Sequence, residues 1–290
     1  MKYITYQELT NTIRKNIWKI PRDIDCIIGV PRSGMLVANI ISSYLNIPLI
    51  DVSAYSQGLN PCGGQRMTYF NNKHKHTGKA LVVDDTVYGG SSMTGVKNIL
   101  QNCSRKMEYI YMCVYLEGYA SDVVDFYLED IHNQIDNDIN IALYEWNIFQ
   151  HHIGFMQKCL YDIDGVFCVE PPDERNEKAY IEYISDATPL FIPKTKIGGI
   201  VTYRLSKNKD ITEKWLDKVG ITYSELYMFK ANSWEERHNS GISPEIFKAE
   251  IYKERHNMKL FVESSDYQAK RIYDLTKKPV LSVDTNTLYQ

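Results

Sequence analysis

Two short segments of this sequence hold paired acidic residues whose spacing suits ligand binding or catalysis. The first is Leu81–Met93 (LVVDDTVYGGSSM). Its adjacent carboxylates, Asp84 and Asp85, can accept hydrogen bonds from a pair of sugar hydroxyls or face a hydrated Mg²⁺. The two glycines that follow let backbone N–H groups approach an anion, and the two serines add donors at a helix N-terminus. The string therefore predicts a phosphate-binding turn behind an acidic pair.

The second string is Tyr161–Phe167 (YDIDGVF), which follows an apolar run. Asp162 and Asp164 are two residues apart, so from an extended segment their side chains point the same way. One carboxylate can attack phosphorus while the other shuttles a proton. Both can lie near one Mg²⁺, which screens the charge of a phosphate. This spacing predicts phosphoryl chemistry.

The elements that must position these residues are short apolar runs that alternate with helical patterns. The strands expected in the first half are Asp25–Val30, Ile47–Val52, Ala80–Asp84, Tyr109–Leu116 and Ile141–Tyr144. Those expected in the second half are Lys158–Ile163, Lys196–Val201, Glu225–Phe229, Met258–Val262 and Pro279–Val283. This alternation predicts two α/β domains, each with a mainly parallel sheet. Weak periodicity after Tyr144 places the boundary between domains 1–152 and 153–290.

Composition excludes several classes of protein. The 290 residues carry a net charge of -3, so no global basic field favours a nucleic-acid partner. No apolar run approaches the roughly 18 residues of a membrane span, and the N-terminal segment lacks the apolar core of a secretion signal. The six cysteines include no CxxC pair, which favours reduced thiols over a zinc site or a disulfide framework. These features predict a cytoplasmic protein without a membrane span.

In its strand–turn–helix context, Leu81–Met93 resembles the ribose-phosphate motif of type I phosphoribosyltransferases, which use 5-phosphoribosyl 1-diphosphate (PRPP). Gly29–Ala38 (GVPRSGMLVA) is similar to the family's pyrophosphate loop, and the two strings follow in the family's order. The resemblance implies that Asp84 and Asp85 hold the ribose hydroxyls and that the turn 86–92 holds the 5-phosphate. The PRPP-binding residues that it implies are Arg32, Ser33, Asp84, Asp85, Thr86, Gly89, Gly90, Ser91 and Ser92.

Two further features bear on this family's chemistry. The glycine-rich polar stretch Gln57–Lys79 would match the catalytic hood that closes over PRPP and keeps water from the reacting carbon. Its His74 and His76 favour a solvated loop over a metal site, because two histidines rarely suffice. Tyr88 stands where many nucleobase-using members have an acidic residue, which favours an acceptor other than a base.

Tyr161–Phe167 resembles the first motif of haloacid-dehalogenase-type phosphatases, and three later segments follow in that family's order. The resemblance implies that Asp162 is the nucleophile and that Asp164 is the acid and base. Thr202 and Lys248 would bind the phosphate, with Lys253 and Lys230 as rivals for the lysine. The Mg²⁺ ligands that it implies are Asp162, Asp164, Glu263 and Asp266, and the segment that it assigns to a small cap is Val169–Lys196.

The two halves together resemble the dual-domain ribofuranosyltransferases of bacterial surface-polysaccharide assembly. This resemblance implies transfer of 5-phosphoribosyl from PRPP to a hydroxyl of a lipid-linked or growing glycan, then removal of the 5-phosphate. A homodimer is expected from the family alone. Two alternatives stay open: a nucleobase phosphoribosyltransferase fused to a nucleotide phosphatase, and a PRPP-sensing domain fused to a phosphatase.

Overall fold

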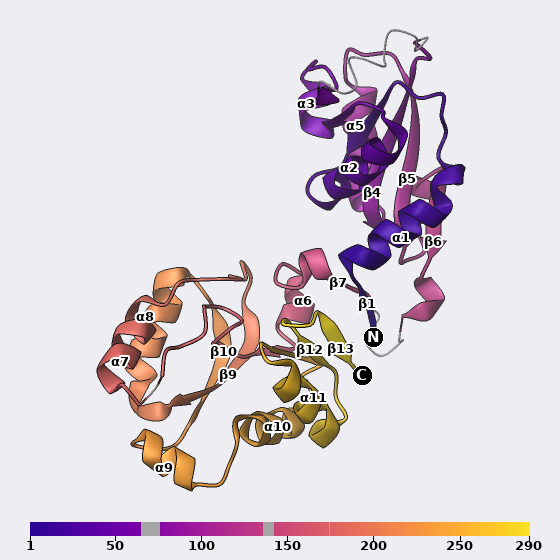
Figure 1. Ribbon diagram of the computed structural model, residues 1–290. Helices are drawn as coiled ribbons and strands as arrows, with labels where there is room; N and C mark the ends of the chain where they lie inside the picture. Colours follow the sequence, from indigo (N-terminus) through magenta and orange to yellow (C-terminus); the bar gives the residue numbers. More distant parts are fainter. Residues whose placement is uncertain (65–75, 136–141, 174) are drawn as a thin grey trace. The chain divides into compact units, whose positions relative to one another are not determined.

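The computed structural model describes residues 1–64, 76–135, 142–173 and 175–290 (Figure 1). The chain divides into two compact units, Lys2–Ala142 and Leu143–Gln290, with Met1 grouped with the second. This division falls earlier in the chain than the boundary between residues 152 and 153 that the sequence predicts. Among the residues described, no helix is long and apolar enough to cross a membrane.

The first unit is built on a five-stranded sheet in the order β3-β2-β4-β5-β6, in which all neighbouring strands are parallel. Its strands are β2 (Cys26–Gly29), β3 (Leu49–Asp51), β4 (Lys79–Val87), β5 (Glu108–Leu116) and β6 (Phe126–Asp130). Four of them match strands that the sequence predicts. The fifth does not: the predicted strand Ile141–Tyr144 corresponds to β7 (Ala142–Tyr144), which is not part of this sheet, and β6 forms the edge instead.

The remaining elements of this half begin with β1 (Lys2–Ile4) and include both α-helices and short 3₁₀ helices. The α-helices are α1 (Tyr6–Asn16), α2 (Ser33–Leu45), α3 (Val52–Ser56) and α5 (Ser91–Gln101). The 3₁₀ helices are Ile17–Lys19, Ser121–Val123 and His132–Gln134. Buried side chains of α5, among them Met93, Val96 and Leu100, join strand residues such as Val82 in one apolar cluster. Burial of this apolar face fixes α5 against the sheet.

The second unit contains a six-stranded sheet in the order β10-β9-β8-β11-β12-β13, parallel except for the β12–β13 pair. Its strands are β8 (Cys159–Tyr161), β9 (Ile197–Leu205), β10 (Tyr223–Phe229), β11 (Leu260–Glu263), β12 (Val280–Ser282) and β13 (Thr287–Tyr289). The two mainly parallel sheets confirm the predicted α/β class. Because β8 lies between β9 and β11, residues that follow these three strands meet at one edge of the sheet.

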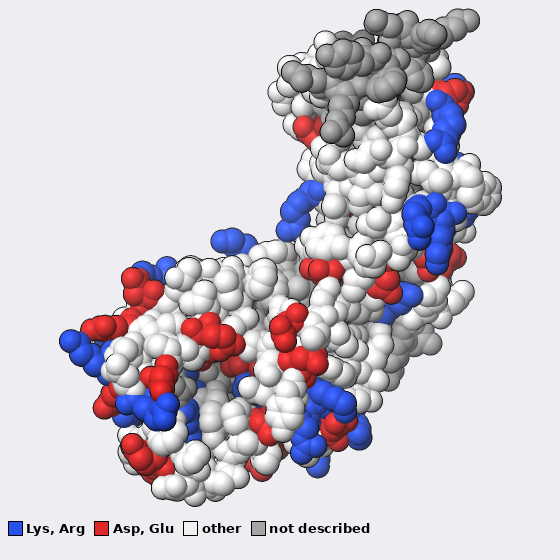
Figure 2. Space-filling model, viewed as in Figure 1, with Lys and Arg blue, Asp and Glu red and all other residues white. Residues whose placement is uncertain are grey.

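Helices flank this second sheet, and Figure 1 shows α7 beside α8 and α10 beside α11. The α-helices are α6 (Ile153–Met156), α7 (Glu177–Asp186), α8 (Lys209–Val219), α9 (Trp234–Asn239), α10 (Pro244–Glu254) and α11 (Asp266–Thr276). The 3₁₀ helices are Glu145–Asn147 and Ser206–Asn208. On the face drawn in Figure 2, acidic and basic side chains are interspersed over the second unit.

Candidate functional site

The acidic pair of the first unit lies at the carboxyl end of β4, where both side chains are buried. Asp84 is 7% exposed and Asp85 is 5% exposed, and the backbone N–H of Asp85 donates to Asp84 Oδ1 at 2.9 Å. Burial, followed by the neighbouring charge of Asp85, raises the pKa of Asp84 to about 9. Burial and the neighbouring carboxylate therefore disfavour the charged form of Asp84, and a ligand that brings hydroxyl donors or a cation would relieve this cost.

A glycine on α2 allows this pair to sit close to the neighbouring loop. A Cβ atom on Gly34 would lie 2.6 Å from the carbonyl oxygen of Val83 and 3.1 Å from Asp84 Oδ1. Because β2 and β4 are parallel, with Gly29 opposite Val83, the loops after both strands begin at the same sheet edge. The structure thus brings Arg32 and Ser33, at the start of α2, to the edge that carries the acidic pair.

The predicted phosphate turn runs from the end of β4 into α5. Gly90 has a φ of 74° and caps α5, and a Cβ there would lie 2.9 Å from Val123 Cγ1. A residue with a side chain would be strained and crowded, so this turn requires glycine. Within it Gly89, Ser91 and Ser92 are exposed and Thr86 is half-buried. Exposed hydroxyls at the N-terminus of an 11-residue helix favour an anion.

The predicted hood lies partly outside the described residues, including its basic residues Arg66, Lys73, His74 and Lys75. Its C-terminal end is tied to Asp25, which accepts hydrogen bonds from the backbone N–H groups of Thr77 and Gly78, each at 2.8 Å. His76 Nδ1 lies 2.5 Å from the same carboxylate. Tyr88, in the position of the family's acidic residue, is 53% exposed.

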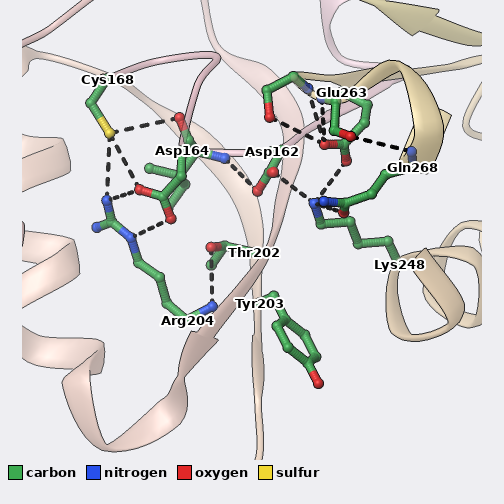
Figure 3. A network of polar contacts seen from close by, with 12 residues as sticks. Asp162, Asp164, Cys168, Thr202, Tyr203, Arg204, Lys248, Glu263 and Gln268 are labelled. Atoms are coloured by element: carbon green, nitrogen blue, oxygen red, sulfur yellow. Dashed lines mark hydrogen bonds and ion pairs between the residues drawn. The ribbon is translucent and has the colours of Figure 1, made fainter. Parts of the chain in front are cut away.

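The second acidic site lies at the carboxyl ends of the central strands of the second sheet, and its carboxylates contact a buried lysine (Figure 3). Lys248 on α10 is 2% exposed, and its Nζ donates to Asp162 Oδ2 at 2.6 Å and to Glu263 Oε2 at 2.7 Å. The same ammonium donates to Gln268 Oε1 at 3.0 Å. Of the three lysines that the sequence offers, Lys248 is the one in contact with Asp162.

The pKa of Asp162 is shifted by burial and by the charged groups around it. Burial is the largest effect and raises the pKa of Asp162 to about 8; the ammonium of Lys248 opposes it, and Glu263 and Asp164 reinforce it. The pKa of Lys248 is raised, because the attraction of the two carboxylates outweighs burial. The lysine therefore stays charged and screens whatever negative charge enters beside Asp162.

Asp164 has different partners, which the sequence reasoning did not identify. Arg204, 1% exposed at the end of β9, donates from Nε to Oδ2 at 3.0 Å and from Nη2 to Oδ1 at 2.6 Å. Tyr183 of α7 donates to Oδ1 at 2.8 Å. Burial opposes ionisation of Asp164, but Arg204 and then Tyr183 outweigh it and lower its pKa. A buried arginine in an otherwise apolar strand was the available signal.

Two further predicted residues, Thr202 and Asp266, make their contacts with groups other than Asp162. Thr202 on β9 is fully buried, and its Oγ1 accepts from the backbone N–H of Arg204 at 3.3 Å (Figure 3). Asp266 begins α11, and its Oδ1 accepts from Thr285 Oγ1 at 2.5 Å and from Tyr289 Oη at 2.8 Å. Neither contact joins these residues to Asp162.

A magnesium ion fits part of the predicted ligand set. Across the described ranges, no group of three or more His, Cys, Asp or Glu residues is arranged to hold a metal. Asp162 and Glu263 converge on the ammonium of Lys248, which occupies the point between them. Mg²⁺ is often bound by one or two carboxylates, water and substrate phosphate. Asp164 turns both carboxylate oxygens toward Arg204. The assignment of Asp162, Asp164, Glu263 and Asp266 as Mg²⁺ ligands therefore stays a prediction, and Asp162 and Glu263 have the donor chemistry that the ion prefers.

Comparison with known proteins identifies the family of the first domain. Residues 5–148 match the family of the phosphoribosyl transferase domain, so the first half of the chain is a type I phosphoribosyltransferase domain, a PRPP-binding domain. Enzymes of this family generally use PRPP with Mg²⁺. The match ends before most of the second unit.

Individual relatives cover parts of the chain. The purine biosynthesis transcriptional repressor PurR of Bacillus subtilis (strain 168) is 27% identical over 119 residues. That segment is 37% of this chain and 42% of the repressor, so the chain spans less than half of that relative's length. The solved purine phosphoribosyltransferase of Pyrococcus horikoshii Ot3 is 25% identical, with a TM-score of 0.34, over 50% of this chain and 92% of that one. The xanthine-guanine-hypoxanthine phosphoribosyltransferase of Helicobacter pylori is 18% identical, with a TM-score of 0.35, over 51% and 93%.

Proposed function

We propose that this chain is a bifunctional ribofuranosyltransferase. Its first domain transfers 5-phosphoribosyl from PRPP to a hydroxyl of a lipid-linked or growing glycan, and its second removes the 5-phosphate. The observation that carries the proposal is the buried arrangement of Asp162, Lys248 and Glu263 in the same chain as a phosphoribosyltransferase domain. Such an arrangement suits a phosphate ester, which is what the first domain would produce. The proposed setting is surface-polysaccharide synthesis in the bacterial cytoplasm.

In the first reaction, a glycan oxygen bonds to C1 of the ribose as the bond from C1 to diphosphate breaks, and the hydroxyl proton passes to the departing diphosphate. Asp84 and Asp85 hold the two ribose hydroxyls, which relieves the mutual repulsion of the carboxylates. The turn from Thr86 to Ser92 holds the 5-phosphate, and Arg32 with Ser33 holds the diphosphate. Mg²⁺ bound with PRPP would neutralise diphosphate charge. Tyr88, in place of an acid that would activate a base, supports a sugar acceptor.

In the second reaction, an oxygen of Asp162 attacks phosphorus, and the bond from phosphorus to the ribose oxygen breaks. Lys248 offsets the negative charge beside Asp162, and Thr202 donates its hydroxyl to the phosphate. Mg²⁺ held by Asp162 and Glu263 would neutralise the phosphate oxygens. Asp164, ionised while paired with Arg204, takes up a proton from solvent when substrate displaces that partner and delivers it to the departing oxygen. It then takes a proton from the water that attacks phosphorus and breaks the bond to Asp162. Because Arg204 and Tyr183 hold Asp164 in this conformation, substrate must displace a partner before Asp164 donates.

Mass spectrometry of a synthetic glycan incubated with PRPP and Mg²⁺ tests both reactions. Wild-type protein should add a pentose, and Asp162→Asn should add a phosphopentose, because transfer continues while phosphate removal stops. The matched control is Asp173→Asn, which removes an exposed carboxylate of the same unit and should behave as wild type. A pentose added by Asp162→Asn would overturn the two-step scheme. Diphosphate released only with a purine, a pyrimidine or orotate would favour the nucleobase alternative.

A PRPP-sensing domain fused to a phosphatase is the second candidate. It is favoured by the segment that resembles a protein described as a transcriptional repressor. Under this alternative, the protein binds PRPP without turnover in the presence of any acceptor. Isothermal titration with PRPP and Mg²⁺, beside an assay for released diphosphate, separates the two: binding with diphosphate release supports the transferase, and binding alone supports the sensor.

A further inference from the structure

A small polar cavity lies at the carboxyl end of β9 and β10 in the second unit. It has a volume of about 90 Å³ and is lined by residues from α7, from the segment after β9 and from the start of α9. The residues that matter here are Glu177, Tyr180, Lys207, Asn208 and Trp234. None of these residues was assigned to the phosphate site described above.

The cavity adjoins the residues that hold Asp164. Leu205, one of its lining residues, directly follows Arg204 in β9. Tyr180 also lines it, and its ring lies 6.2 Å from that of Tyr183, the residue that donates to Asp164. In the proposed phosphatase reaction, Asp164 faces the oxygen between phosphorus and sugar. The cavity therefore adjoins the residues that contact Asp164, on the side where the alcohol of the ester would lie in that reaction.

One wall of the cavity is a preordered aromatic ring. Trp234 stacks on His238, with ring centroids 4.7 Å apart and an interplanar angle of 9°. The stack spans one turn of α9, whose N-terminus is fixed by Ser233 Oγ accepting from the backbone N–H of Glu236 at 3.1 Å. A ring held in this way loses little conformational freedom when a ligand contacts it. Indole rings offer an apolar face to the C–H side of a sugar.

The floor of the cavity offers hydrogen-bonding capacity. Asn208 is 5% exposed, and its side chain makes no capping hydrogen bond to α8. Within the ranges that the structure describes, its amide is in none of the hydrogen bonds observed. The amide therefore keeps donor and acceptor capacity that a ligand in the cavity can use. At the rim, Lys207 Nζ donates to Glu177 Oε1 at 2.6 Å, which leaves further polar atoms of both groups for hydroxyls.

We infer that this cavity binds the ribofuranosyl unit of the phosphate ester, with sugar hydroxyls on Asn208 and the Lys207–Glu177 pair and the ring against Trp234. This inference rests on the proposed phosphatase reaction and names its specificity determinants. A neutral polyol suits the site because both charge signs and an amide line it. An ester whose alcohol lacks hydroxyls gains none of these contacts.

The test compares two phosphate esters with the full-length protein and Mg²⁺. Methyl ribofuranoside 5-phosphate presents the sugar, and methyl phosphate presents a methyl group without hydroxyls or a ring. The measured ratio is kcat/KM for the sugar ester divided by kcat/KM for the ester without hydroxyls. We expect Asn208→Leu to lower this ratio by about tenfold, because the side chain then offers no hydrogen bond to the sugar. Trp234→Ala should lower the same ratio. Trp18→Ala, an exposed tryptophan of the first unit, is the matched control and should leave the ratio unchanged.

Each outcome bears on a different claim. A ratio that stays at the wild-type value in both variants overturns the sugar pocket and leaves the phosphatase proposal standing. Wild-type protein that hydrolyses neither ester overturns the phosphatase proposal, and the pocket with it. If Asn208→Leu is inactive on both esters through misfolding, the ratio for Trp234→Ala decides.

Discussion

The two acidic sites of this protein neutralise their charge in different ways. In the first unit, Asp84 lies next to Asp85, and no ion pair to Asp84 occurs among the described residues. In the second unit, Asp162 and Glu263 share the ammonium of Lys248, and Asp164 is paired with Arg204. Both sites are buried, so the difference lies in the cations and not in solvent access.

This difference separates two strategies for binding a phosphorylated ligand. A buried carboxylate such as Asp84, which has no ion pair among the described residues, is poorly satisfied until a ligand brings hydroxyls or Mg²⁺. Its contributions to stability and to affinity therefore oppose each other. A carboxylate site with built-in cations is satisfied before substrate arrives, and each cation becomes a structural requirement. Substitutions should therefore have opposite effects on stability at the two sites.

The largest effect is expected from Lys248→Met. It leaves Asp162 and Glu263 buried without their shared cation, and breaking a buried pair in this way costs about 3–5 kcal/mol. Hydrogen exchange of the backbone amides in β8 and β11 measures the free energy of opening in this unit. Phosphatase activity should be lost as well.

Lys253→Met is the matched control, since Lys253 is an exposed lysine on the same helix. It should change the free energy of opening by less than about 0.5 kcal/mol. An effect of Lys248→Met as small as that of the control would show that the buried pairs contribute little, and the contrast between the two sites would fail.

A smaller loss is expected from Arg204→Lys. Lysine keeps the charge but cannot form the two parallel hydrogen bonds to Asp164, and losing one charge-assisted bond costs about 2 kcal/mol. Hydrogen exchange of β9 amides measures this loss. Arg175→Lys, at an exposed pair with Asp173, is the control and should cost almost nothing. Equal losses at the two arginines would contradict the structural role of Arg204.

The sequence predicted some residues of these sites and missed others. Motif order offered Asp162, three candidate lysines and the two acids Glu263 and Asp266. It did not choose among the lysines, and the contact of Lys248 with Asp162 came from the structure. Nor could motif order select Arg204, because its burial depends on Asp164, which lies 40 positions earlier in the chain. The strand β6 was missed for a related reason. It is a short edge strand, Phe126–Asp130, and its acidic residues interrupt the apolar pattern that identifies a strand.

At the first site, Asp84→Asn should stabilise the domain by about 1.5 kcal/mol while weakening PRPP binding. The raised pKa means that folded protein holds a proton that the unfolded chain loses, so stability falls as pH rises from the ordinary value of 3.8 toward about 9. The variant removes this titration, and its advantage should grow with pH across that window. Hydrogen exchange of β4 amides at several pH values measures it.

A control at Asp25 sharpens this prediction. Burial opposes ionisation of Asp25, but hydrogen bonds from Thr77, Gly78 and His76 outweigh it and lower its pKa. Asp25→Asn should therefore destabilise the same domain, most at pH values above the ordinary pKa. If both asparagine variants shift stability in the same direction, the repulsion assigned to the acidic pair at the end of β4 is wrong.

The smallest effect is expected from Tyr183→Phe, which removes one neutral donor from Asp164 and leaves the paired guanidinium in place. Since Arg204 still neutralises the carboxylate, the loss in stability should be about 0.5–1 kcal/mol. Hydrogen exchange of α7 amides measures it, and Tyr267→Phe, at an exposed ring of the same unit, is the control. A loss as large as that for Lys248→Met would mean that the hydroxyl, and not the buried cation, keeps this second site satisfied.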